Sequence, residues 1–273
     1  MSTQAQASKP LAVFVHIPRT GGTTLWSIIR RLYSPGRWLR IMEGTSEENA
    51  VALRSILETR PNDYDLVGGH LRPFEVIEAA SRPVQYVTML RHPAGQAISK
   101  YYKVLRKDSQ PLHGEFVEGD IPVEDGVLRL VANIQTRTLA GLGAEDDCTR
   151  DDLERAKVVL TEQFATFGLL ERYDASMIMF KRALGWSMPV YVRRNVSHNR
   201  PKAPQDAARE RATEHNALDV ELFEYALALF DQRVAEAGEG FQRELGRFAR
   251  HNRLFKLKQQ VGQVRRQLRG EDA

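Results

Sequence analysis

The stretch "LAVFVHIPRTGGTTLW", residues 11–26, decides the fold. Its first seven residues are almost all apolar and include β-branched side chains, a composition typical of a buried strand. Two glycines and two threonines follow, and they favour a tight turn that opens a helix. A strand, a turn and a helix in this order predict an α/β protein.

The same alternation continues along the chain. Further strands are expected at 63–69, 84–90, 164–170 and 189–194, and helices at 23–33, 46–59, 73–80, 94–107, 150–162 and 174–184. The pattern predicts a mainly parallel sheet flanked by helices. From about residue 206 the sequence lacks strand-like runs, which predicts a helical C-terminal third. Residues 108–148 mix loop and helix signals, and whether they cover a site stays open.

Composition narrows the classes of function. The 273 residues carry a net charge of +4, a mild excess that favours anionic ligands without indicating a nucleic-acid binder. The single cysteine, Cys148, allows no disulfide within the chain, and no cluster of metal-ligand residues is visible, so we expect no metal site. The polar first residues and the lack of a long apolar run lead us to expect a cytoplasmic protein.

The loop after the first strand has the composition of an anion site. Gly21 and Gly22 let the backbone approach an anion, Thr23 and Thr24 open a helix whose N–H groups point at it, and Arg19 adds positive charge. The alternative is an ordinary helix start after a tight turn. A nucleotide-triphosphate loop needs a lysine directly before the threonine, and that position is Gly22, so this class is disfavoured.

A second segment, "RHPAGQAISKYYKVLR" (91–106), follows another strand. Pro93 suits the first turn of a helix, which places Arg91 at the strand end and Ser99 about two turns along the helix. Both residues can face one anion. Alternatively, Arg91 forms a structural ion pair and Ser99 is an exposed helix residue.

With "RRNVSHNRP" (193–201), these segments resemble the carbohydrate sulfotransferases that use 3′-phosphoadenosine-5′-phosphosulfate (PAPS), most closely the heparan sulfate 2-O- and 6-O-sulfotransferases and their bacterial relatives. The resemblance implies a P-loop-like sheet and a PAPS site. Two departures concern Arg19, where the family has lysine, and His92 with Gln96, where the second motif often has Asp and Arg. Arg194 is a candidate replacement for the missing charge. The implied donor-binding residues are Arg19, Thr20, Gly21, Gly22, Thr23, Thr24, Arg91, Ser99 and Ser197.

His70 is the expected catalytic base. It ends the predicted strand "DYDLVGGH" at the edge where the donor loop lies, and two glycines precede it, whereas His16 falls inside the first predicted strand. The resemblance assigns the same residue, although a strand-end histidine without chemistry is the alternative. His70 would deprotonate an acceptor hydroxyl while Arg19 stabilises the departing phosphate.

The acceptor expected from the resemblance is a carbohydrate or a glycolipid. Ser197 is a further donor contact, and Arg193, Arg194 and Arg200 are candidates to line the path of a polar or anionic acceptor. Two other functions stay open: a phosphotransferase that uses ATP, and a non-catalytic protein that binds anionic polysaccharide with this fold.

The C-terminal sequence predicts a separate feature. We divide the chain into a flexible N-terminus (1–9), a sulfotransferase domain (10–249) and a basic amphipathic helical tail (250–273). An apolar stripe recurs along the tail at steps of three and four, formed by Leu254, Leu257, Val261, Val264 and Leu268. It can pack on its own domain, form a homodimer or lie on an anionic membrane, and the one-sided positive charge favours the membrane.

Overall fold

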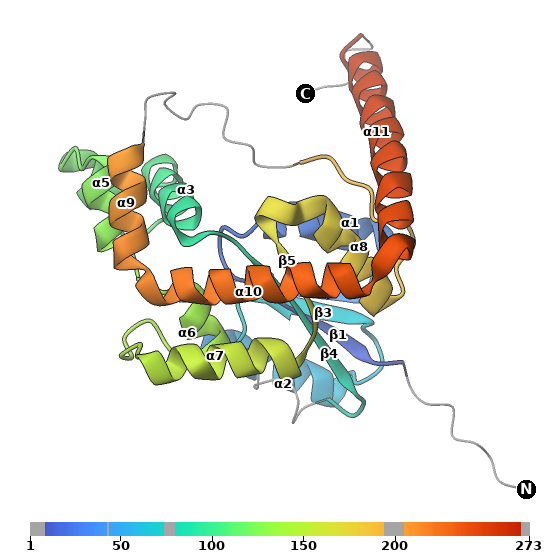
Figure 1. Cartoon of the computed structure of the whole chain (residues 1–273), viewed down its shortest axis with the longest axis horizontal. Coiled ribbons are helices and arrows are strands. Elements are labelled where there is room, and N and C mark those ends of the chain that lie inside the picture. Colours follow the sequence, from blue (N-terminus) through green and yellow to red (C-terminus); the bar gives the residue numbers. More distant parts are fainter. Residues whose placement is uncertain (1–8, 43, 74–79, 194–204, 269–273) are drawn as a thin grey trace, which may run out of the picture.

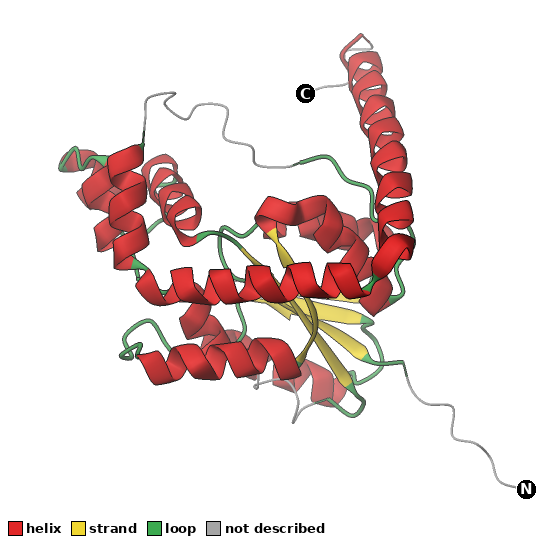
Figure 2. Ribbon diagram, in the orientation of Figure 1, coloured by secondary structure: helices red, strands yellow, loops and turns green. Residues whose placement is uncertain are grey.

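A five-stranded sheet, parallel throughout, forms the centre of the protein (Figure 2). The structure is a computed structural model that describes residues 9–42, 44–73, 80–193 and 205–268. The sheet has the order β2-β3-β1-β4-β5. Its strands are β1 (Leu11–Val15), β2 (Trp38–Ile41), β3 (Leu66–Gly69), β4 (Val84–Leu90) and β5 (Phe164–Leu169). The expected α/β class with a mainly parallel sheet is confirmed.

Helices connect and cover these strands (Figure 1). The helices expected in the first two thirds of the chain are found within one residue of their predicted bounds, except for 73–80, most of which lies outside the described residues. The C-terminal third is helical, as predicted. The helical elements are α1 (Gly22–Leu32), α2 (Ser46–Thr59), α3 (Pro93–Arg106), α4 (His113–Glu118), α5 (Val123–Gly126), η2 (Val127–Arg129), α6 (Ile134–Ala140), α7 (Arg150–Glu162), η3 (Leu170–Arg172), α8 (Tyr173–Leu184), α9 (Asp206–His215), α10 (Ala217–Glu236) and α11 (Gly238–Leu268).

The sheet is buried on both faces because successive side chains of a strand point to opposite sides. On β1, Leu11, Val13 and Val15 enter a core with α2, α7 and α10. The alternate residues Ala12 and Phe14 enter a second core with α1, α8 and the first part of α11. Three layers result, and a continuous apolar strand is the sequence pattern that such a sheet requires.

Residues 108–148 contain short helices rather than strands. Phe116 of α4 and Val127 of η2 pack with Ile98 and Tyr101 of α3, and α9 closes this smaller core through Ala208 and Ala212. Part of the segment 108–148 therefore packs on α3, together with α9.

Two expectations about strands were wrong. The sequence reading missed β2, a strand of only four residues at the edge of the sheet. It also predicted a strand at 189–194, and residues 189–193 form none. The N–H of Tyr191 donates instead to Asn252 Oδ1 of α11, at 2.7 Å, so a side chain takes the backbone donor that a strand neighbour would use.

The strand order has a switch point beside β1. From β1 the chain passes to β2 at one edge of the sheet and returns to β3, whereas β4 lies on the other side of β1 and leads to β5. The loops that leave β1 and β4 therefore diverge. Ligands of open parallel sheets bind beyond the carboxyl ends of the strands at such a switch point.

Candidate active site

The loop after β1 turns sharply into α1. Arg19 and Gly21 have φ angles of 67° and 97°, and Gly21 precedes the first residue of α1. The buried Thr20 donates its hydroxyl to Ile17 O at 2.8 Å. Positive φ is uncommon outside glycine, so Arg19 is held in a conformation that its surroundings must stabilise. The loop leads directly into the start of α1, and the start of a helix favours a bound anion.

The two sequence motifs meet through Arg19. Its guanidinium donates to Ser99 Oγ from both Nε and Nη2, at 3.0 and 2.8 Å. Arg91 Nη1 donates to the carbonyl oxygen of Arg19 at 3.0 Å. Ser99 is buried, so the alternative of an exposed helix residue is wrong. The end of β1, the end of β4 and α3 thus contribute side chains to one place.

Arg91 is positioned from the far side by α6 and α10. Gln135 accepts from the N–H of Arg91 at 2.9 Å and donates to its carbonyl oxygen at 2.7 Å. The buried Asp219 of α10 accepts the N–H groups of Gln135 and Thr136 at the start of α6. Burial raises the pKa of Asp219, and these N–H groups oppose that rise. A carboxylate at a helix start is favourable, and here it fixes the residue that holds Arg91.

The two departures of the second motif have structural roles. Gln96 is buried and donates to Pro18 O at 2.7 Å, which ties α3 to the loop after β1. The N–H of His92 donates to Glu171 Oε1 at 3.0 Å, and its ring contacts Phe223. Neither residue replaces the missing charge.

His70 and His16 lie side by side at the ends of β3 and β1. The N–H of His16 donates to Gly69 O at 2.8 Å, and the two imidazole centroids are 5.3 Å apart. Asn49 of α2 donates to His70 O at 3.2 Å. The strand pairing of β1 with β3 therefore sets the distance between the rings.

Glycines allow this close arrangement. A Cβ on Gly22 would lie 1.9 Å from His16 Nε2, so the imidazole of His16 packs directly on the start of α1. A Cβ on Gly69 would lie 1.6 Å from Ile41 O, and one on Gly68 would lie 2.5 Å from Phe14 O. The pair before His70 thus makes room for the backbone of the neighbouring strands β1 and β2.

Positive groups surround both histidines. Burial and, to a smaller extent, the charges of Lys103, Arg40 and Lys100 together lower the pKa of His70 to about 4. Burial lowers the pKa of His16 to about 3, with His70 and nearby cations contributing. Both imidazoles are neutral near pH 7, which a proton acceptor requires.

The cations also act on one another. Burial, Lys103 and Arg19 lower the pKa of Lys100 to about 8, and burial followed by Arg19 lowers the pKa of Lys103. Lys100 Nζ donates to Gln110 Oε1 at 3.0 Å. A cluster of mutually repelling cations at the carboxyl edge of a sheet is a site for an anion.

Comparison with known proteins shows what the chain resembles. No family model matches the chain. It is 25% identical to heparan-sulfate 6-O-sulfotransferase 3 of Mus musculus over 286 residues, which cover 82% of this chain and 58% of that protein. It is 28% identical to galactose-3-O-sulfotransferase 3 of Bos taurus over 167 residues, which cover 56% of this chain and 39% of that protein. The chain is thus similar, at low identity, to two sulfotransferases whose names give a carbohydrate as the acceptor.

The chain spans about half the length of the curated proteins that it matches, at 58% and 39% of their sequences. The resemblance inferred from the two motifs is thus supported. The roles of single residues stay predictions.

The sequence analysis missed two residues near the site. His16 was placed inside the first strand, but β1 ends at Val15 and His16 lies at the edge. Its place directly before the glycine loop was a usable signal. No such signal exists in the sequence for Tyr173, because this residue lies far along the chain from the loop after β1. It packs against Gly21, and its buried hydroxyl has no hydrogen-bond partner among the described residues.

Ser197, Arg194 and Arg200 fall outside the described residues. Arg193 is exposed and lies beside Tyr191, where its hydrogen bond opposes the rise in the pKa of that phenol. Within the described ranges, no three His, Cys, Asp or Glu side chains are grouped to hold a metal ion.

Proposed function

We propose that this protein is a sulfotransferase that moves the sulfuryl group of PAPS to a hydroxyl of a carbohydrate or glycolipid. The observation that carries the proposal is the hydrogen bonding of the Arg19 guanidinium to Ser99 Oγ. It joins the loop expected to hold the 5′-phosphosulfate to the helix expected to face the 3′-phosphate. The relatives support the reaction class, since both are named as sulfotransferases acting on carbohydrate.

The donor is assigned to the carboxyl ends of the strands. The loop amides from Thr20 to Thr24 and the Arg19 guanidinium would bind the 5′-phosphosulfate, because N–H donors at a helix start and a planar cation suit a phosphate-like group. Arg91 and Ser99 would bind the 3′-phosphate. This arrangement keeps the P-loop-like architecture that the sequence predicts, without its lysine.

His70 is the proposed base. Its neutral imidazole would accept the proton of the acceptor hydroxyl while that oxygen forms a bond to sulfur. The bond from sulfur to the phosphate oxygen breaks at the same time, and adenosine 3′,5′-bisphosphate leaves with the electron pair. Arg19 and the loop N–H groups stabilise the charge that develops on this leaving phosphate. Binding in line supplies the remaining rate gain.

Ligand binding tests the donor assignment directly. Adenosine 3′,5′-bisphosphate should raise the melting temperature by several degrees at saturating concentration, because a ligand that binds only the folded state stabilises it. ATP, which lacks the 3′-phosphate, should raise it much less. A larger shift with ATP would favour the phosphotransferase alternative.

Transfer tests the enzyme assignment. Labelled PAPS should pass its sulfuryl group to members of a panel of sugars and glycolipids, and the His70→Ala variant should bind adenosine 3′,5′-bisphosphate yet fail to transfer. Donor binding without transfer to any acceptor would favour the non-catalytic polysaccharide binder.

A further inference from the structure

The distal part of α11 extends away from the rest of the domain (Figure 1). Its first part is anchored, because Phe241 and Phe248 are buried and Asn252 accepts the N–H of Tyr191. Phe255 lies under the guanidinium of Arg31, and Lys256 lies over the Tyr191 ring. Beyond these contacts the helix leaves its own core.

An apolar stripe is exposed on this distal part. Leu254, Leu257 and Val261 have exposed fractions of 57%, 49% and 51%, and their spacing of three and four places them on one face. The alternative that the stripe packs on its own domain is therefore wrong for these three residues. Large apolar side chains grouped on a surface mark an interaction site.

Cations flank the stripe. Arg253 lies on one side of it, Lys258 and Arg265 on the other, and all three are exposed. A groove of about 310 Å³ opens at the root of the stripe, with apolar walls from Met188, Val190 and Phe255. Lys258 and His251 stand at its rim. This surface thus combines an apolar stripe and groove with positive charges on both sides of the stripe.

A second copy of this chain fits the stripe poorly. If Leu254 and Leu257 take the core positions of a coiled coil, Arg253 and Lys258 take the flanking positions that face each other across a parallel pair. An antiparallel pair sets Lys258 against Arg265. Both arrangements place like charges together, which disfavours a second copy of the helix. The positive charges therefore favour an anionic partner.

We propose that the face formed by Leu254, Leu257, Val261, Arg253, Lys258 and Arg265 binds an anionic lipid surface. A basic amphipathic helix lies in such an interface with its apolar side among the acyl chains and its cations at the phosphates. The groove beside Phe255 adds apolar lining from Met188 and Val190 next to the stripe. The inference is independent of the catalytic assignment.

Vesicle sedimentation with the full chain tests the proposal. The protein should bind phosphatidylglycerol vesicles at least about tenfold more tightly than phosphatidylcholine vesicles at low salt, because several cations each gain from the anionic surface. The double variant Leu257→Asp, Val261→Asp should lose at least about tenfold in affinity for phosphatidylglycerol. Lys258→Glu with Arg265→Glu should lose a similar factor and most of the salt dependence.

A matched control uses exposed valines on other helices. Val51 of α2 and Val158 of α7 have exposed fractions of 68% and 50%, and Val51→Asp with Val158→Asp should leave vesicle binding unchanged. A chain that ends after Lys256 keeps the anchoring contacts and should also lose binding. Unchanged binding by the stripe variant, equal loss in the control, or no binding by the full chain would each overturn the proposal. A dimer in solution that the stripe variant dissociates, with vesicle binding intact, would assign the face to a second copy.

Discussion

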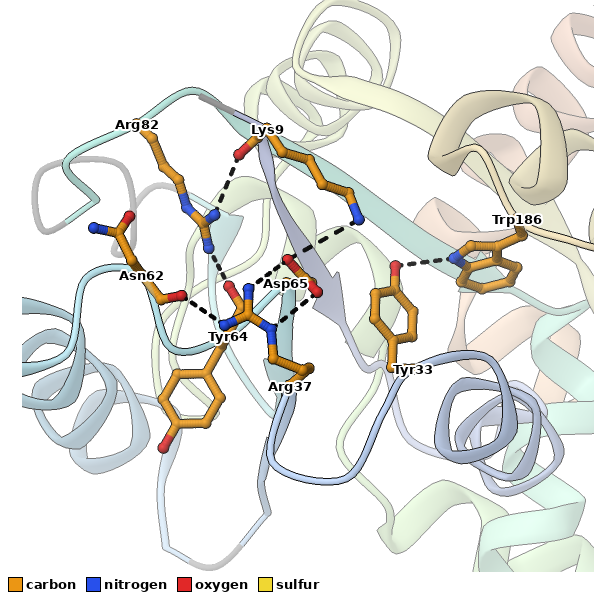
Figure 3. A network of polar contacts seen from close by, with 8 residues as sticks. All are labelled: Lys9, Tyr33, Arg37, Asn62, Tyr64, Asp65, Arg82 and Trp186. Carbon is orange, nitrogen blue, oxygen red and sulfur yellow. Dashed lines mark hydrogen bonds and ion pairs between the residues drawn. The ribbon is translucent and has the colours of Figure 1, made fainter. Parts of the chain in front are cut away.

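The two ends of the parallel strands differ in how their charged side chains are paired. At the amino edge, Asp65 accepts from Arg37 at 2.8 and 3.1 Å, and Lys9 lies 4.0 Å away (Figure 3). Arg82 donates to the carbonyl oxygens of Lys9 and Tyr64. The hydrogen bonds from Arg37 lower the pKa of Asp65. These residues precede β1, β2, β3 and β4, so the network joins the starts of four strands.

At the carboxyl edge the cations act on one another instead. Burial lowers the pKa of His70, and the charges of Lys103, Arg40 and Lys100 add to that effect. Burial likewise lowers the pKa of Lys103, with Arg19 as the next cause. The amino edge supplies its own carboxylate to its cations, whereas the carboxyl edge is the one that we propose binds an anion from outside. The difference separates a structural edge from a binding edge, and the following variants test that separation.

The largest effect is expected for His70→Ala. Turnover should fall by about 10²–10⁴, the range for removing a general base, while adenosine 3′,5′-bisphosphate still binds. Steady-state kinetics and calorimetry measure the two quantities. His215→Ala, at the end of α9, is the control and should leave turnover unchanged. Near-normal turnover of His70→Ala would show that His70 is not the general base.

Arg19→Ala should lower turnover by about 10²–10³, because the leaving phosphate loses a charged donor. Arg19→Lys restores the residue usual in the family and should keep most of the activity, since it retains the charge. Initial-rate measurements with PAPS compare the two. If Arg19→Ala is as active as Arg19→Lys, the loop has another role.

Arg91→Ala should weaken binding of adenosine 3′,5′-bisphosphate by about 10–100-fold, the value of a charge-assisted hydrogen bond. Adenosine 5′-phosphosulfate lacks the 3′-phosphate and should lose far less affinity. Calorimetric titration of both ligands measures the ratio, with the exposed Arg54→Ala as control. Equal losses for the two ligands would place Arg91 away from the 3′-phosphate.

At the amino edge, Asp65→Asn should lower the free energy of unfolding by about 1–2 kcal/mol, because two partly exposed hydrogen bonds to Arg37 lose their charge assistance. Turnover should stay unchanged, since this edge lies across the sheet from the site. Urea denaturation and kinetics together check the claim. A large loss of turnover at unchanged stability would show that the amino edge also takes part in the reaction, contrary to the separation of the two edges.

The last prediction concerns pH. The folded state holds the pKa of His70 at about 4 and that of His16 at about 3, below the usual 6.5. The unfolded chain therefore binds more protons between these values, so the free energy of unfolding should fall as pH drops from about 6.5 toward 4. The slope should be shallower in His70→Asn. Denaturation at a series of pH values measures it, and an identical slope would mean that His70 titrates normally.

The sequence by itself determined the main elements and the two motifs. Runs of apolar residues at 11–15, 84–90 and 164–169 had to be buried strands, because only a sheet covered on both faces accepts them. The glycines after β1 and the proline after β4 marked where the helices begin. These signals are local, since a few neighbouring residues fix the backbone conformation.

Only the tertiary structure decided which of these residues meet. The pairing of β1 with β3 sets His16 beside His70, and Gln135 fixes Arg91 from 44 residues away. The short β2 exists because β3 pairs with it, and the expected strand near Tyr191 is absent because Asn252 takes its N–H. The exposure of Leu254, Leu257 and Val261 likewise depends on where α11 leaves the core. Such contacts join residues distant in the chain, so periodicity and composition carry no record of them.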